Sequence, residues 1–125
     1  MRRSAAGAPR LRELALIPIW DWHAFMRVIA YRSLQNFWAL HPPAEQPLKA
    51  WYDEARKAEW KQPADIKAHY RNASFVGNNR VAFNIKGNDY RLIVAVAYRI
   101  GVVYVKFVGT HAQTDDVDAA TVEMD

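Results

Sequence analysis

Residues 79–115 read NRVAFNIKGNDYRLIVAVAYRIGVVYVKFVGTHAQTD, and this stretch decides the fold. It contains three runs rich in Val, Ile, Phe and Tyr, the side chains that β-sheets favour: RVAFNIK, YRLIVAVAYR and VVYVKFVGTH. Gly87-Asn88 separates the first two runs and suits a tight hairpin, because both residues readily adopt positive φ. Ile100-Gly101 separates the second run from the third. The stretch therefore predicts three consecutive antiparallel strands.

The first predicted hairpin has one apolar and one polar face. A two-residue loop at Gly87-Asn88 makes Asn84 face Arg91, and in the same register Arg80 faces Ala95. Side chains alternate between the two faces of a strand, so residues of equal parity lie together. The apolar row consists of Val81, Phe83, Ile85, Leu92, Val94 and Val96. The polar row, which we call the cationic face, consists of Arg80, Asn84, Lys86 and Arg91.

The third strand extends the cationic face. If Phe107 faces the same core as the apolar row, Tyr104 and Lys106 join the cationic face. That parity needs a two-residue loop at Ile100-Gly101, and a three-residue loop would reverse it. The strand ends at His111, which places this histidine beside the Arg91 end of its neighbour. Two interpretations stay open for the cationic face: ordinary solvated surface, or a binding surface for a polyanion.

Upstream of the strands, the sequence predicts a short strand and two helices. Residues 27–32 form the strand, and Ser33 is the expected N-cap of a helix that Pro42-Pro43 ends. A second helix is expected over residues 44–60, because its apolar residues recur at helical spacing: Leu48, Trp51, Tyr52 and Ala55. We read these aromatic residues as a core face.

The remaining segments complete an α+β fold. Residues 61–71 are expected to be a connection with one helical turn, and residues 72–76 another strand. The acidic residues after His111 lack periodicity and predict a loop and a frayed tail. The expected order is β-α-α-β-β-β-β: a small antiparallel-dominated sheet with two N-terminal helices packed on one face.

Composition limits the possible functions. A chain of 125 residues fits one domain, and its 51% hydrophobic content is typical of a globular protein. The absence of cysteine excludes disulfides, thiol catalysis and cysteine-bound zinc. The four histidines lack metal-binding spacing, so we expect no metal and no cofactor. The net charge of +4 permits a polyanionic partner without requiring one. No stretch approaches the ~20 apolar residues of a membrane span.

The run RVAFNIKGNDYRLIV followed by FVGTH resembles the HigB-type toxins, mRNA interferases of the RelE-like superfamily. The upstream run WYDEARKAEWKQPADIKAHYRNASFVGNNR also resembles that family, and Met26 begins a stretch similar to the usual start of these toxins. The resemblance covers residues 26–118. We therefore expect residues 1–25 to be an N-terminal extension that reflects a mistaken start codon, and residues 119–125 to be a tail.

The resemblance implies a cytoplasmic endoribonuclease in which a ribose 2′-OH attacks the neighbouring phosphate. It places catalysis on the cationic face, with the expected catalytic residues Lys86, Arg91 and His111. The residues expected to bind RNA and its phosphates are Arg80, Asn84, Lys106 and Tyr104. For Arg80 a structural ion pair, and for His111 a structural hydrogen bond, remain open. Asp115 would orient His111 or be solvated.

The family pattern also implies partners and reveals one departure. The implied partners are ribosome-bound mRNA and a HigA-like antitoxin with a helix-turn-helix domain, with no membrane. In the family that this chain resembles, the sequence after the last strand is close to THxEYD. This chain has Thr114 at the position of the tyrosine. Tyr90 or Tyr104 would have to replace that tyrosine. The alternative function is therefore a catalytically weak or inactive RNA-binding or regulatory module on the same fold.

Overall fold

A computed structural model describes residues 26–124. The elements are β1 (Arg27–Ile29), α2 (Tyr31–Leu40), the 3₁₀ turn η2 (Pro42–Ala44), α3 (Glu45–Lys57), α4 (Pro63–His69), β2 (Ser74–Val76), β3 (Arg80–Ile85), β4 (Tyr90–Ala97), β5 (Val102–Thr110) and α5 (His111–Asp115). Within this range the strands form one sheet in the order β1-β5-β4-β3-β2, antiparallel except for the β1–β5 pair. The expected α+β fold is confirmed. The predicted extension at residues 1–25 lies outside the described residues.

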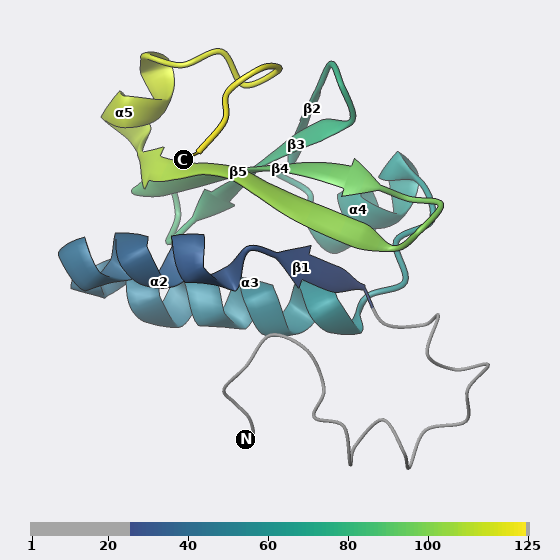
Figure 1. Ribbon diagram of the computed structural model, residues 1–125, viewed down its shortest axis with the longest axis horizontal. Coiled ribbons are helices and arrows are strands. Elements are labelled where there is room, and N and C mark those ends of the chain that lie inside the picture. The colour runs from purple at the N-terminus through teal and green to yellow at the C-terminus, as the bar shows by residue number, and fades with distance from the viewer. Residues whose placement is uncertain (1–25, 125) are drawn as a thin grey trace, which may run out of the picture.

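The core lies between one face of the sheet and the helices α2, α3 and α4. Figure 1 shows α2 and α3 side by side along one side of the sheet, with α5 and the C-terminal segment on the other side. The apolar row of the β3–β4 hairpin is buried in this core, as predicted, together with the stripe on α3. Trp51 of α3 meets Phe83 of β3 edge-on, with ring centroids 5.5 Å apart. No helix within residues 26–124 is long and apolar enough to cross a bilayer.

Both hairpin loops have four residues where two were expected. The β3–β4 loop is residues 86–89, and the β4–β5 loop is residues 98–101. In the first loop, positive φ falls on Lys86 (54°) and Gly87 (65°) rather than on Gly87 and Asn88. An even number of loop residues leaves the alternation of faces unchanged. The predicted pairings of Asn84 with Arg91 and of Arg80 with Ala95 are therefore confirmed.

A bulge in β5 makes one prediction about this strand wrong. The register shifts between two neighbouring pairs, which are Val94–Val105 and Ile93–Phe107. Lys106 is the extra residue, and a one-residue insertion reverses the alternation that follows it. Phe107 therefore lies on the outer face of the sheet and not in the core, while Val105 and Val108 are buried in the core.

The first helix begins earlier than predicted, although it ends before Pro42-Pro43 as expected. α2 starts at Tyr31, its N-cap is Ala30, and Ser33 lies inside the first turn, so the predicted Ser33 cap is wrong. The ring of Tyr31 lies 4.3 Å from that of Tyr52 on α3 and 5.7 Å from that of Trp38, centroid to centroid. Tertiary packing of this kind outweighs local capping preference. α4 is also longer than the single turn expected, and its Ile66 is fully buried in the core.

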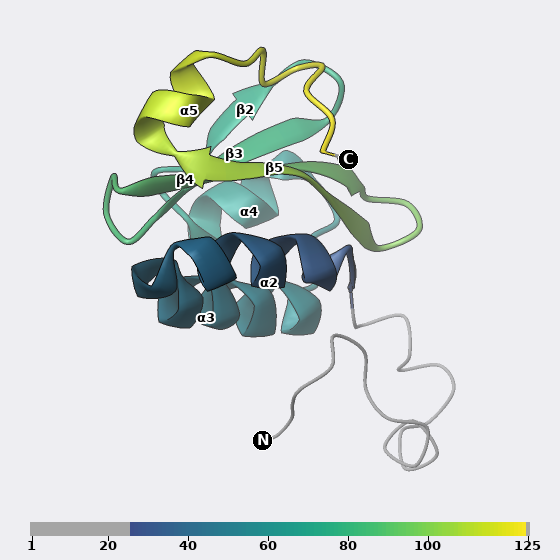
Figure 2. The same ribbon diagram turned by 60° about the vertical axis from the view of Figure 1, so that its left-hand side comes forward.

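The chain after β5 begins with a helix, which corrects the prediction of a loop there. Residues 116–124 have no helix or strand, as expected of a loop, but they contact the sheet and are not frayed. Thr110 caps α5 through a capping box: its hydroxyl accepts a hydrogen bond from the Gln113 backbone N–H, and the Gln113 side chain accepts one from Thr110 N–H. Residues 118–124, which we call the C-terminal strap, then run back along the outer face of the sheet (Figures 1 and 2). This face is partly closed, since Ala82 is 5% and Ile93 0% exposed.

The turned-out ring of Phe107 leaves no room for a side chain at position 109, so we expect glycine to be required there. A Cβ at this position would lie 2.8 Å and 2.9 Å from ring atoms of Phe107 and 2.9 Å from Gln113 Oε1. We expect Gly109→Ala to lower the free energy of unfolding by about 1–3 kcal/mol in urea titrations, because the ring or the capping box must shift. Gly77→Ala is the matched control, since its Cβ would lie 4.0 Å from its nearest neighbour, Ala120 Cβ. Equal stabilities for the two variants would contradict this account.

Candidate functional site

The predicted site residues share the outer face of the sheet but separate into two groups. The first group, the hairpin end, lies where β3 ends, β4 begins and α5 follows β5: Asn84, Lys86, Arg91 and His111. The second group, the strap end, lies at the start of β3 and in the first half of β5: Arg80, Tyr104 and Lys106. Asn84 lies four positions after Arg80 on β3, which corresponds to ~13 Å along the strand.

Arg91 and Asn84 form the centre of the hairpin end. They pair across β4 and β3, and Arg91 Nη2 donates a hydrogen bond to Asn84 Oδ1 at 3.1 Å. Arg91 Nε is buried and has no hydrogen-bond partner, although the residue as a whole is partly exposed. The neighbour of Arg91 on β5 is Gly109, and the ring of Phe107 and the side chain of Gln113 lie over that glycine. Asn84 thus holds this guanidinium in place, and the terminal N–H groups of a guanidinium are those that bind an anion in two parallel bonds.

Lys86 lies at the rim of the same group. Its ammonium pairs with Asp89 Oδ2 at 3.0 Å, and the two side chains are 48% and 57% exposed. Exposed ion pairs contribute only about 0–1 kcal/mol, so the lysine can exchange this carboxylate for another anion at little cost. The predicted catalytic lysine is therefore accessible and close in the chain to Arg91, across the loop.

His111 is fixed at the corner between β5 and α5. It is the first residue of α5 and is partly buried, and its backbone N–H donates to Asp89 O at 3.3 Å. That bond fastens the corner to the β3–β4 loop, which carries Lys86. Asp115 is exposed at the last position of α5, one turn beyond His111, and the structure gives it no hydrogen bond to the imidazole. The orienting role of Asp115 remains a prediction.

None of the residues considered for the missing tyrosine takes its place at the hairpin end. Thr114 is 8% exposed, and its hydroxyl donates to Thr110 O at 2.9 Å. Tyr90 faces the core, where its ring contacts Phe37 edge-on at a centroid separation of 5.5 Å. Tyr104 lies at the strap end, with Lys106 Nζ 5.6 Å from its ring centroid. Tyr90 is therefore excluded as a substitute, and Tyr104 lies at the other end of the face.

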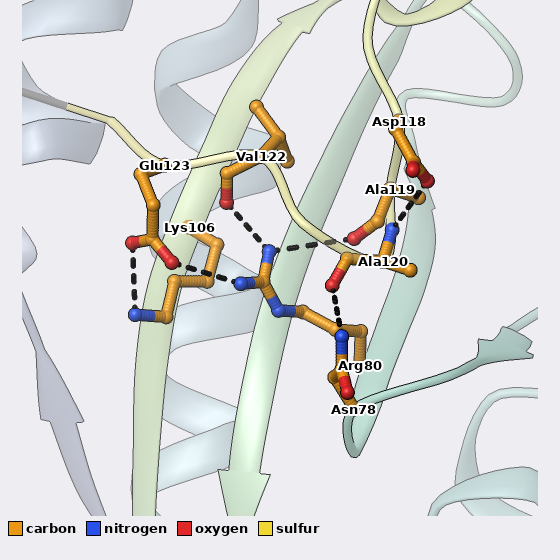
Figure 3. Close-up of polar contacts among 8 residues, drawn as sticks. All are labelled: Asn78, Arg80, Lys106, Asp118, Ala119, Ala120, Val122 and Glu123. Carbon is orange, nitrogen blue, oxygen red and sulfur yellow. Dashed lines mark hydrogen bonds and ion pairs between the residues drawn. The ribbon is translucent and has the colours of Figure 1, made fainter.

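The strap end is closed by internal contacts. Arg80 Nη2 pairs with Glu123 Oε2 at 2.9 Å, and Lys106 Nζ pairs with Glu123 Oε1 at 3.0 Å (Figure 3). Arg80 Nη1 also donates to the carbonyl oxygens of Val122 and Ala119, at 2.5 and 3.4 Å. The alternative reading of Arg80 as one member of a structural ion pair is therefore what the structure shows. The cationic face is accessible at the hairpin end and covered at the strap end.

Sequence reasoning missed the residues that organise this face from the C-terminal side. Glu123, Gln113 and Gly109 were not singled out, although each contacts or makes room for a site element. The spacing Thr110-x-x-Gln113 is that of a capping box and was a usable signal for α5. Nothing local marked Glu123, because its partners lie far away in the sequence. Among residues 26–124, no three His, Asp or Glu side chains are grouped as metal ligands would be.

The charges around Glu123 should be measurable by titration. The hydrogen bond from Lys106, with a smaller contribution from Arg80, lowers the pKa of the Glu123 carboxyl below its usual value. A lowered pKa means that the ion pairs hold the strap above the usual carboxyl pKa and are lost as pH falls through the lowered one. In Lys106→Gln, we expect the midpoint of the titration curve of this carboxyl carbon, measured by NMR, to move to higher pH. Lys57→Gln removes an exposed lysine on α3 and should leave it unchanged; equal curves for both variants would be the contrary result.

A family model described as HigB_toxin, the RelE-like toxic component of a toxin–antitoxin system, matches residues 44–117. That range contains the whole hairpin end and leaves out the C-terminal strap. No curated protein matches the chain. Because the matched range covers more than half of the sequence and contains strands β2 to β5, the chain belongs to the HigB toxin family of RelE-like toxins.

Proposed function

We propose that this toxin is a metal-independent endoribonuclease of a type II toxin–antitoxin system that cuts ribosome-bound mRNA in the cytoplasm. The observation that carries the proposal is the grouping of Arg91, Lys86 and His111 at one accessible end of the sheet, in a chain that belongs to the HigB family. A guanidinium, an ammonium and an imidazole are the groups that cleavage of a phosphodiester by its own 2′-OH requires.

In the proposed reaction, the 2′-oxygen loses its proton and attacks the adjacent phosphorus. The bond from phosphorus to the 5′-oxygen breaks, that oxygen takes up a proton, and a 2′,3′-cyclic phosphate remains. Arg91 binds the non-bridging oxygens, where charge develops. Asn84 keeps the guanidinium in place through the bond it accepts from Arg91 Nη2. His111 transfers the protons, and Lys86 stabilises charge at the rim.

A second candidate function rests on Thr114. Its hydroxyl is engaged with the Thr110 carbonyl, so at this position the chain offers no side chain that stacks on a base or passes on a proton. A toxin fold that binds RNA through the same face but cuts it slowly or not at all is consistent with this observation. Measuring growth arrest and RNA cleavage side by side distinguishes the two, because arrest without cleavage would favour the binding module.

Substitutions at the hairpin end should abolish toxicity. We expect induced expression of the wild-type chain to arrest growth, and Arg91→Ala or His111→Ala to relieve the arrest, with mRNA cleavage on ribosomes reduced about 10²–10⁴-fold. Arg99→Ala, in the exposed loop of residues 98–101, and His69→Ala, at the end of α4, are matched controls that should remain toxic. Arrest that is unchanged in both hairpin-end variants would remove the proposed site.

The proposed partner is a HigA-like antitoxin with a helix-turn-helix domain. We expect it to shield the cationic face, and a gene for a small helix-turn-helix protein beside the toxin gene would support the pairing. Amide hydrogen exchange of residues 80–91 should slow on binding, because the antitoxin would cover the hairpin end. Unchanged exchange there, with slowed exchange elsewhere, would instead favour an antitoxin that keeps the toxin off the ribosome.

A further inference from the structure

Glu123 occupies a position suited to a phosphate. Its two carboxylate oxygens accept separate bonds, one from Arg80 at 2.9 Å and one from Lys106 at 3.0 Å, as Figure 3 shows. Carboxylate and phosphate oxygens accept the same charge-assisted hydrogen bonds, and arginine can bind a carboxylate or a phosphate through bidentate hydrogen bonds. Both cations belong to strands of the sheet, whereas their acidic partner comes from a separate segment at the end of the chain. Arg80 and Lys106 are therefore held near each other by the sheet, and Glu123 fills the anion site between them.

Arg80 is buried and needs hydrogen-bond acceptors at this site. Its side chain is only 7% exposed, and a guanidinium removed from water needs acceptors around it. All the acceptors that the structure gives it belong to the C-terminal strap: the Glu123 carboxylate and the carbonyls of Val122 and Ala119. If the strap leaves, Arg80 and Lys106 lose these acceptors together. A vacated strap end would then bind another anion on the same face that carries Arg91.

The strap is held by contacts that can be exchanged. The Glu123 side chain is 60% exposed, so water reaches this carboxylate, although its partner Arg80 is buried. Besides the two bonds that Arg80 Nη1 donates to strap carbonyls, Asn78 Nδ2 donates an exposed bond to Ala120 O at 2.8 Å, and Met124 packs against the core. Residues 112–125 contain five carboxylates and no lysine or arginine, so the excess positive charge of the chain lies entirely before them. An acidic segment thus covers part of a basic surface.

We propose that Arg80 and Lys106 form a phosphate-binding subsite for single-stranded RNA, which the carboxylate of Glu123 occupies in the free protein, so that the C-terminal strap must be displaced before RNA lies across the whole cationic face. This inference rests on the proposed function, since it supplies the second contact for an RNA strand whose scissile phosphate is at Arg91. The strap itself, residues 118–124, lies outside the range that matches the family, residues 44–117. A merely structural clamp would instead stabilise the fold without competing with RNA.

The test compares RNA affinity in variants of the full chain. The probe is a fluorescein-labelled single-stranded RNA with 2′-O-methyl groups throughout, which cannot be cut by 2′-OH attack, and binding is followed by fluorescence anisotropy. We expect Glu123→Gln to bind about two- to fivefold more tightly than wild type, the factor corresponding to one exposed ion pair that no longer competes. In a Lys106→Gln background the same substitution should give no such gain, because half of the subsite is gone.

Asp116→Asn is the matched control, since it removes the same charge from an exposed residue just before the strap. An equal gain in Asp116→Asn and Glu123→Gln would assign the effect to overall charge and overturn the subsite. No gain in Glu123→Gln, while ribosome-dependent cleavage still requires Arg91, would overturn the subsite and leave the proposed function standing. If Glu123→Gln binds RNA more tightly only when Lys106 is present, but toxicity is unchanged by Arg91→Ala and His111→Ala, the proposed function is overturned instead.

Discussion

The alternation of side chains across the β3–β4 hairpin is the constraint on which the structure depends. One row of the hairpin, which includes Val81, Phe83 and Leu92, is buried against α3 and the other helices. Because alternation has a period of two, burying this row forces Asn84 and Arg91 to the opposite side, away from α2, α3 and α4. A slip of one residue would bury the cations and expose the core. The packing of Trp51 on Phe83 therefore fixes the orientation of the candidate site as well as the fold.

The second constraint is the bulge in β5, which lets one strand serve both faces. Before the extra residue Lys106, Val103 and Val105 fill the core, and after it Val108 does so while Phe107 turns outward. The ring of Phe107 then lies against Gly109, which sits opposite Arg91. Bulges commonly re-aim side chains beside functional sites. In this protein the bulge divides the outer face into an accessible end and a covered end.

Much of this arrangement follows from local pattern, and the rest does not. Strand identity, hairpin register and the apolar stripe on α3 were predictable because each depends on residues close together in sequence. The start of α2 was not, because Tyr31 joins the helix through contacts with Tyr52 on α3. The sequence pattern did not reveal the bulge, because Val105 and Phe107 are both apolar and each would fit a core position. The partners of Arg80 were hidden because they lie about forty residues away and include two backbone carbonyls, which carry no sequence signal.

The exposed position of the Glu123 ion pairs has a consequence for ionic strength. Added salt screens charges beyond ~10 Å at 0.1 M. It also weakens RNA binding, because the counterions released from the RNA gain less entropy when the surrounding salt is already concentrated. The same salt loosens the strap from Arg80 and Lys106, which opens more of the surface to the nucleic acid. The two effects oppose each other, so the logarithm of affinity should fall less steeply with the logarithm of salt concentration than the number of phosphate contacts alone would require.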